Sequence, residues 1–162
     1  MIFGWCALEG RTGHGAGRAL LAELYRAETG EALPPIVKNQ RGKPFFADSP
    51  WHFSISHTQK HAFCVLDGEN IAIDAEELDR RVDLRLAERV LSPGEKTQFD
   101  TAADQAKALL TFWVLKEAAA KLSGEGLRGF PNHTDFSLDD PRIREIDGCI
   151  VAILREGETY AL

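Results

Sequence analysis

Strand patterns and helix patterns occupy largely separate stretches of this chain, and that order restricts the folds it can form. In the first half, one helix is expected between a first strand and three later strands, at residues 1–8, 17–29, 53–56, 62–66 and 71–73. The second half is expected to begin with helices (84–91, a helix starting after Ser92, and 104–122) and to end with strands (135–138, 149–154 and 159–162). This segregation predicts an α+β fold.

Capping signals mark the expected helix boundaries. Residues 92–95, Ser-Pro-Gly-Glu, combine a capping box with a proline at the first helical position. Asp104 is expected to cap the long helix, and Gly124 to end it. In the first half, three glycines surround His14 and are expected to form a flexible entry to the helix over 17–29; they are Gly13, Gly15 and Gly17.

The composition suits a folded globular protein. With 162 residues, of which 44% are hydrophobic and 27% charged, the chain can form one compact domain or two small lobes that share a core. The net charge of -6 and the pI of about 5.4 give no global electrostatic support for nucleic-acid binding. No stretch approaches the length of a membrane span, so neither a nucleic-acid nor a membrane partner is expected.

The cysteines indicate neither zinc nor a disulfide framework. Cys6, Cys64 and Cys149 are widely spaced and odd in number, and no CxxC or CxxH spacing occurs. Buried free thiols in a reducing cytosol are therefore expected. The apolar residues 1–6 are short and lack a basic leader, so they predict a first strand rather than a signal peptide. Together these features predict a cytoplasmic protein.

Two carboxylates stand on one expected strand, at Asp74 and Glu76. Because successive strand side chains point to opposite faces, these two share a face about 7 Å apart along it. A divalent cation relieves the repulsion between converging carboxylates, and their hard oxygens suit Mg²⁺. The alternative is that they begin a solvated acidic turn that continues to Glu77 and Asp79. On this segment alone, the solvated turn is the favoured interpretation.

A charged pair also stands on the long expected helix. Glu117 and Lys121 are four residues apart, so they lie on one helical face, with Trp113 one turn earlier. The alternative is an ordinary surface ion pair worth a few tenths of a kcal/mol. Only the joint occurrence of both segments favours a functional site.

Four segments together resemble the phosphopantetheinyl transferase superfamily. Residues 73–76 (IDAE) and 113–121 (WVLKEAAAK) resemble its signature pair, and residues 42–44 (GKP) and 53–57 (FSISH) resemble two upstream segments. They occur in the family's order, and the resemblance covers about residues 41–130, closest to the Sfp-like branch. The sequence departs from the family pattern at Ala72, Ala75 and Val114, and it lacks the usual basic segment before residues 18–21.

The resemblance implies a two-lobed fold with a pseudo-twofold axis and coenzyme A in the cleft between the lobes. Each lobe would have an antiparallel sheet packed with helices. A shortened first lobe would span residues 1–66, and a second lobe carrying the metal and catalytic motifs would span residues 67–162. The Sfp-like branch implies a monomer.

The resemblance also implies roles for individual residues. Asp74, Glu76 and Glu117 would hold Mg²⁺ against the diphosphate of coenzyme A, and Lys121 would meet the charge on the leaving group. The other expected contacts of coenzyme A are Arg18, Lys43, Ser56, His57 and Lys116.

The implied reaction moves the 4′-phosphopantetheine group from coenzyme A to a serine of an apo acyl or peptidyl carrier protein, which is a holo-acyl-carrier-protein synthase activity. Catalysis of this kind is mainly positioning and charge neutralisation. Glu117 is the first candidate for the base that takes the serine proton, directly or through a water, and Glu76 is the second. A carrier platform is expected at four arginines, Arg80, Arg81, Arg85 and Arg89, with an ordinary solvated helix face as the alternative.

Two other functions stay open at this point. The short first lobe is compatible with a binding module that holds coenzyme A or a carrier protein without transferring anything. A metal-dependent phosphohydrolase is disfavoured, because the sequence has no further His or Asp cluster for a second metal and no REx₂E-type carboxylate run. The identity of the carrier protein is not indicated by the sequence.

Overall fold

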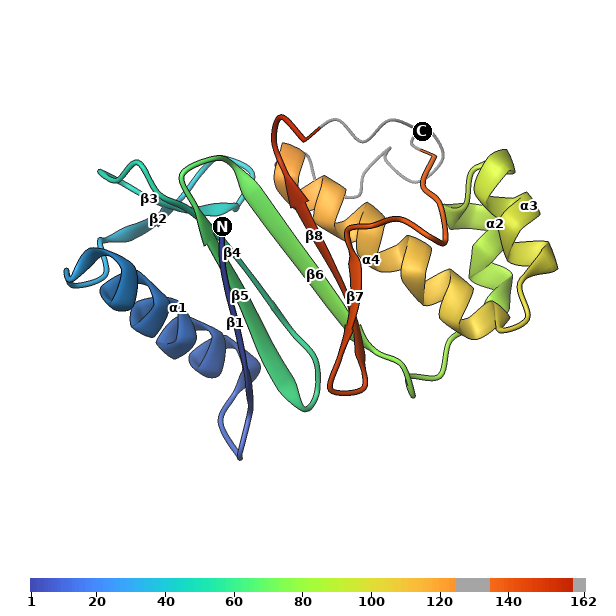
Figure 1. Cartoon of the computed structure of the whole chain (residues 1–162), viewed down its shortest axis with the longest axis horizontal. Helices are drawn as coiled ribbons and strands as arrows, with labels where there is room; N and C mark the ends of the chain where they lie inside the picture. The colour runs from blue at the N-terminus through green and yellow to red at the C-terminus, as the bar shows by residue number, and fades with distance from the viewer. Residues whose placement is uncertain (125–134, 159–162) are drawn as a thin grey trace.

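The computed structural model describes residues 1–124 and 135–158, in which two three-stranded antiparallel sheets each pack against one long helix (Figure 1). The first sheet has the strand order β1-β5-β4; with its helix it comprises β1 (Ile2–Ala7), α1 (Gly13–Thr29), β4 (His52–His57) and β5 (His61–Asp67). The second sheet has the order β6-β8-β7; with its helix it comprises β6 (Ile71–Glu77), α4 (Gln105–Ser123), β7 (Ile143–Ile146) and β8 (Cys149–Arg155). The expected α+β class is confirmed.

The two sheets have the same topology. In each, a strand leads into a helix and then into a hairpin, and the last strand of the hairpin pairs with the first strand. This common topology agrees with the pseudo-twofold arrangement that the resemblance implies, although the two halves show no obvious repeat in amino-acid sequence. The insertions between these elements differ. The first half inserts the hairpin of β2 (Ile36–Lys38) and β3 (Pro44–Phe46), and the second inserts the 3₁₀ turn η1 (Leu84–Leu86), α2 (Ala87–Val90) and α3 (Pro93–Thr101).

Apolar clusters fill the three spaces between these layers. Along β5, Cys64 and Leu66 belong to the cluster under α1, while Phe63 and Val65 belong to the cluster between the two sheets. Alternate residues of a strand face opposite sides, which explains why all of β5 is buried. The third cluster joins α4 to the second sheet and to the helices before it.

The start of α1 differs from the flexible entry expected there. The helix begins at Gly13, and the side chain of Thr12 caps it by accepting a hydrogen bond from the Gly15 amide. A Cβ atom at Gly13 would lie 2.5 Å from the His57 ring, and one at Gly17 would lie 2.5 Å from Ile55 Cγ2. These glycines therefore allow α1 to approach β4 closely.

The helices of the second half follow their capping signals. Both hydrogen bonds of the expected capping box at Ser92 and Glu95 are present, and Asp104 caps α4 at the Lys107 amide. The helix expected over 84–91 is only the turn η1 followed by the single turn of α2. Leu91 is already extended, because it leads directly into the cap of α3.

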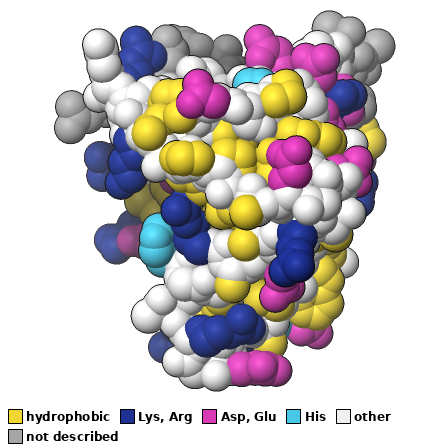
Figure 2. Space-filling model, turned by 90° about the vertical axis from the view of Figure 1, so that its left-hand side faces the viewer, with side chains coloured by type: hydrophobic (Ala, Val, Ile, Leu, Met, Phe, Trp, Pro, Cys, Tyr) yellow, Lys and Arg dark blue, Asp and Glu magenta, His cyan; other side chains and the backbone are white. Residues whose placement is uncertain are grey.

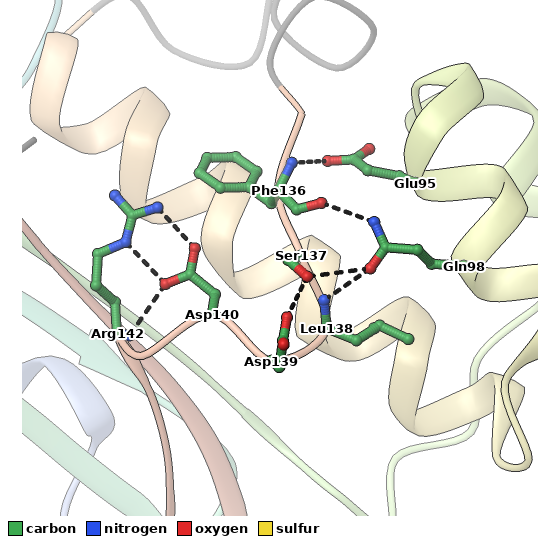
Figure 3. A network of polar contacts seen from close by, with 8 residues as sticks. All are labelled: Glu95, Gln98, Phe136, Ser137, Leu138, Asp139, Asp140 and Arg142. Atoms are coloured by element: carbon green, nitrogen blue, oxygen red, sulfur yellow. Dashed lines mark hydrogen bonds and ion pairs between the residues drawn. The ribbon is translucent and has the colours of Figure 1, made fainter. Parts of the chain in front are cut away.

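The strand expected at 135–138 is absent, and side chains of α3 replace a strand partner (Figure 3). The Phe136 amide donates to Glu95 Oε1 at 3.1 Å, and Gln98 Nε2 donates to the Phe136 carbonyl at 3.2 Å. The Leu138 amide donates to Gln98 Oε1 at 3.0 Å. A strand that was not expected forms later in the chain, as β7, which pairs with β8. The strand expected at 159–162 lies outside the described residues.

The cysteines are free thiols, as expected: Cys64 and Cys149 are buried, and Cys6 is half-buried. Burial raises the pKa of the Cys64 thiol to about 12, which keeps it protonated and unreactive. Within residues 1–124 and 135–158, no helix combines the length and the apolar character needed to cross a bilayer.

Candidate active site

The two sequence segments that carry carboxylates meet where α4 crosses β6. Asp74 lies on β6 opposite Ala152 of β8, and Ala152 belongs to the apolar cluster under α4. The face of β6 that carries Asp74 and Glu76 is thus the face toward the helix. From α4, the Lys121 ammonium nitrogen reaches back to the Ile73 carbonyl at 3.1 Å.

Asp74 is the most enclosed of these acids, with 7% of its surface exposed. Its Oδ1 atom accepts a hydrogen bond from Ser56 Oγ at 3.0 Å and forms an ion pair with Lys121 Nζ at 2.6 Å. Three segments that are distant in the sequence, on β4, β6 and α4, therefore meet at one oxygen atom.

Glu117 is half-buried beside these groups, and its pKa is raised above the usual carboxyl value. Desolvation is the largest cause, and the negative charges of Asp74 and Glu76 add to it, while Lys121 opposes it. The three acids expected to act together are thus close enough to repel one another. A cation at this place would relieve that repulsion.

Glu76 lies on the same face of β6 but closer to solvent. Its carboxylate forms an ion pair with Arg80, four residues later in the chain. Arg80, which is expected in the carrier platform, thus also stands at the edge of the carboxylate group.

The donor chemistry of these three acids fits Mg²⁺, which prefers hard oxygen ligands. Desolvation first, and then the charges of Asp74 and Glu76, raise the pKa of Glu117, and a bound cation would oppose these effects. Within the described residues, however, no three His, Cys, Asp or Glu side chains are arranged so that they could hold a metal ion together. Joint coordination would require Glu76 to turn from Arg80 and Asp74 to loosen from Lys121.

A cleft of about 620 Å³ opens beside the carboxylates, between α1, the β2–β3 hairpin and the end of α4. Among the described residues that line it, five are Lys or Arg, two are His and one is Glu: Arg18, Lys38, Arg41, Lys43, Lys121, His14, His57 and Glu117. Figure 2 views the molecule from the α1 side and shows Lys and Arg side chains standing among apolar surface. The cleft is thus basic although the chain is acidic.

Two of the residues expected to contact coenzyme A face this cleft from neighbouring elements. Arg18 lies on α1, and His57 ends β4, where its ring packs against Gly13 at the start of α1. The close approach of the helix to β4 therefore brings an imidazole and a guanidinium group to the same wall.

Lys43 lines the cleft, but its ammonium group has partners inside the protein. It donates to Asn70 Oδ1 at 2.9 Å and to the Leu122 carbonyl at 3.1 Å, in the last turn of α4. Burial lowers its pKa, with a smaller opposing effect of Glu156. In this arrangement Lys43 ties the hairpin to the helix end.

Lys116 and Ser56 are not placed as expected. Lys116 is 1% exposed, and its ammonium nitrogen lies 2.8 Å from Glu95 Oε2 in the core between α4 and α3. The expected contact between Lys116 and coenzyme A needs correction, because the side chain leaves α4 away from the cleft. Ser56 is buried, and its hydroxyl group faces Asp74 rather than the cleft.

Three basic residues of the cleft were not expected from the sequence: His14, Lys38 and Arg41. His14 carries no motif, and its position follows from the glycines that allow α1 to pack on β4. Arg41 directly precedes the GKP segment, which was the one available signal.

Comparison with known proteins agrees with this geometry. A model of the 4'-phosphopantetheinyl transferase superfamily matches residues 70–156, which include Asp74, Glu76, Glu117 and Lys121. The cleft residues from α1, the hairpin and β4 lie before the matched range.

Individual relatives carry the same name. The 4'-phosphopantetheinyl transferase HetI of Nostoc sp. is 35% identical over 123 residues, covering 69% of this chain and 52% of HetI. The AcpT protein of Escherichia coli K12 is 34% identical over 114 residues, covering 67% of this chain and 56% of AcpT. The Sfp protein of Bacillus subtilis 168 is 33% identical over 113 residues, covering 68% of this chain and 49% of Sfp. The chain thus matches about half the length of these relatives.

Proposed function

Because the chain belongs to the 4'-phosphopantetheinyl transferase superfamily, we propose that it moves the 4′-phosphopantetheine group of coenzyme A onto a serine of an apo acyl or peptidyl carrier protein. The second product is adenosine 3′,5′-bisphosphate. The serine oxygen forms a new bond to the phosphorus next to pantetheine, and the bond from that phosphorus to the bridging oxygen breaks.

One observation carries this proposal more than any other, namely the basic cleft lined by Glu117 and by Lys121, the ion-pair partner of Asp74. Five Lys or Arg side chains line a cavity of about 620 Å³ in a chain whose net charge is -6. A nucleotide with a diphosphate and a further phosphate is a ligand of matching charge. The neighbouring acids would hold the cation that such a diphosphate carries.

We include Mg²⁺ in the proposal on the basis of donor chemistry. Asp74, Glu76 and Glu117 would hold the ion, and it would neutralise charge on the diphosphate oxygens when bound. Arg80 and Lys121 are the counter-ions already present beside these acids. Each would become available to another anion once its carboxylate turned to the metal.

The chain's own residues supply the remaining steps. Glu117 is the proposed base, directly or through a water, because it lines the cleft next to Lys121. Glu76 is the second candidate, and its ion pair with Arg80 makes it the weaker one. Lys121 would stabilise the negative charge that develops on the departing bisphosphate.

The carrier platform remains part of the proposal. Arg81, Arg85 and Arg89 are exposed after β6, where an acidic partner could approach the carboxylate edge of the site. Leu84 and Leu86 are each 40% exposed beside them and add apolar contact area. Arg85 also pairs with Asp83, so its guanidinium group is held in place.

Several further expectations also stay within the proposal. A division into lobes at residues 66 and 67 would fall at the end of β5, just before the chain changes sheets at β6. A single chain contributes both walls of the cleft, which supports action as a monomer. Location in the cytoplasm remains a prediction.

A binding module without transfer is the competing function. The observation that favours it is the internal pairing of the two groups expected on phosphates, Lys43 and Ser56. A metal-dependent phosphohydrolase is the third possibility, and it would show product release with water as the acceptor.

Intact-mass spectrometry separates these functions. Several apo carrier proteins are incubated with coenzyme A, Mg²⁺ and the protein, and a gain of one phosphopantetheine mass on any of them is expected. If calorimetry shows coenzyme A binding but no carrier protein gains mass, the protein is a binding module. Release of adenosine 3′,5′-bisphosphate without a carrier protein would indicate the hydrolase.

A further inference from the structure

Two serines connect the sheets at the point where β4 runs beside β6. These strands belong to different sheets, yet their residues are in extensive contact. The Ile73 amide donates to Ser54 Oγ at 3.2 Å, and the Ala75 amide donates to Ser56 Oγ at 3.2 Å. Because the two serines are two residues apart on a strand, they point to the same side. Their hydroxyl groups thus accept hydrogen bonds from β6 amides, in the place of the carbonyl groups of a neighbouring strand.

Only one of the two serines makes a further hydrogen bond to an acid. Ser56 Oγ also lies 3.0 Å from Asp74 Oδ1. A hydroxyl group has a single proton to donate. Since the Ala75 amide already donates to Ser56 Oγ, the hydroxyl proton is directed to the carboxylate.

The surroundings strengthen this contact. Ser56 is 6% exposed and Asp74 is 7% exposed, so water competes little for either group. Lys121 donates to the same Oδ1 atom from the other side. Two donors on different elements thus fix one oxygen of the carboxylate and, with it, the orientation of the whole group.

We propose that Ser56 is a positioning residue that orients the Asp74 carboxylate for metal binding, while Ser54, which also lines the cleft, joins the sheets through the Ile73 amide. This inference rests on the proposed function, in which Asp74 is a metal ligand. It replaces the expected contact of Ser56 with a phosphate, because the buried hydroxyl group is already committed between the two strands.

The test compares two alanine variants that remove the same kind of group from one strand. Ser56→Ala and Ser54→Ala each leave one amide of β6 without its acceptor, so both are expected to lower the melting temperature to a similar extent. Mn²⁺ serves as the probe, and its binding is measured by electron paramagnetic resonance with coenzyme A present. Coenzyme A binding without metal is measured by calorimetry.

Ser56→Ala is expected to weaken Mn²⁺ binding roughly tenfold or more, as loss of an outer hydrogen-bond partner does at other metal sites. Ser54→Ala should keep Mn²⁺ binding near the wild-type value, and Ser56→Ala should leave metal-free binding of coenzyme A unchanged. Equal loss of Mn²⁺ binding in both variants would overturn the proposal. Weaker metal-free coenzyme A binding in Ser56→Ala alone would also overturn it, in favour of a phosphate contact.

A second pair of variants covers the case in which an alanine variant fails to fold. Ser56→Cys and Ser54→Cys retain side-chain volume but replace the hydroxyl group with a weaker donor. The same difference in Mn²⁺ affinity is expected between them, and its absence would count against the proposal.

Failure of this inference is distinct from failure of the proposed function. If the wild-type protein modifies a carrier protein but the Ser56 and Ser54 variants bind Mn²⁺ alike, only the positioning role is lost. If the wild-type protein binds Mn²⁺ with the expected difference between variants but modifies no carrier protein, only the transfer function is lost. A wild-type protein that binds no Mn²⁺ would overturn the positioning role.

Discussion

The Lys121 ammonium nitrogen lies 2.6 Å from Oδ1 of Asp74, an acid 47 residues earlier in the chain. This ion pair joins the two sequence segments that carry the carboxylates. It also places a cation where charge would develop on a departing phosphate.

Lys121→Met is therefore expected to reduce carrier modification by about 100-fold or more, as loss of a group that stabilises transition-state charge does elsewhere. The variant should also lose some stability, because the buried Asp74 carboxylate would keep its hydrogen bond from Ser56 but lose its ion pair. Intact-mass time courses and thermal melting measure the two effects.

Lys116→Met is the matched control on the same helix. Here the removed ammonium group neutralises Glu95, and both side chains are buried. Stability is expected to fall by about 3–5 kcal/mol, which is typical when one partner of a buried ion pair is lost. Urea unfolding measures this loss. A Lys116 variant with normal stability but weak coenzyme A binding would restore the original expectation for this residue.

Glu117→Gln is expected to stabilise the fold at neutral pH while it abolishes transfer. The folded protein holds the Glu117 proton more tightly than the unfolded chain, because burial raises the pKa of Glu117 above its ordinary value of 4.5. Wild-type stability therefore falls as the pH rises from the unfolded pKa to the folded one. The amide has no charge to desolvate, so the variant should lack this loss.

Thermal melting of both proteins from pH 4 to pH 8, without divalent metal, tests the direction of this pH dependence of stability. The stability advantage of the variant should grow with pH. A variant less stable than the wild-type protein at pH 8 would contradict the assigned environment of Glu117.

Asp74→Ala should abolish transfer, and so should removal of divalent metal by a chelator. The alanine variant loses a proposed metal ligand, whereas the chelated wild-type protein should recover after Mg²⁺ is restored. Mass spectrometry follows both. Full activity of either preparation would remove these carboxylates from the proposed metal site.

Gly13→Ala should weaken coenzyme A binding by pushing the His57 ring away from the cleft. The new Cβ atom would lie 2.5 Å from the ring, closer than real atoms approach. Alanine at a helical glycine otherwise favours the helix by up to about 1 kcal/mol, so a destabilised variant would point to the clash. We expect an increase of about threefold to tenfold in the KM for coenzyme A, equivalent to one lost hydrogen bond.

Gly68→Ala is the control, because a Cβ atom there would meet nothing within 4 Å. Its KM for coenzyme A should equal that of the wild-type protein. Unchanged values in both variants would exclude His57 from the binding wall.

Arg85→Glu should raise the apparent KM for the carrier protein without changing coenzyme A affinity. The new carboxylate would stand beside Asp83 and repel an acidic partner. Loss of an attractive charge and gain of a repulsive one should cost about tenfold at low salt and less at high salt. Arg144→Glu on β7 is the control on a different strand, and equal effects in both variants would argue for a general charge effect.

Local signals in the sequence were sufficient for much of the fold. The capping box at Ser92, the cap at Asp104 and the stop at Gly124 set the ends of α3 and α4 as expected, since each depends on groups within one turn. The segment at 135–138 was wrong because its backbone partners are the side chains of Glu95 and Gln98, about 40 residues away. Sequence periodicity contains no information about such a partner.

The same distinction applies to the site. Spacing predicted that Glu117 and Lys121 share one face of α4, and the resemblance implied that they meet Asp74 of β6; the structure brings Lys121 to Asp74. Lys116 was misplaced because it directly precedes Glu117, to which the resemblance gives a role. The sequence could not show that the Lys116 side chain pairs with the buried Glu95 on another side of the helix. His14 was missed because only the packing of α1 on β4 brings it to the cleft.

The bond from Lys43 to the Leu122 carbonyl makes the mouth of the cleft and the last turn of α4 parts of one cooperative unit. If the β2–β3 hairpin swings outward, it removes a cation from a helix terminus whose carbonyl groups need one. Opening of the cleft and fraying of the helix would then be a single event with a single free energy. Amide hydrogen exchange at residues 120–124 would accordingly report how often the cleft opens, without any probe attached to the cleft itself.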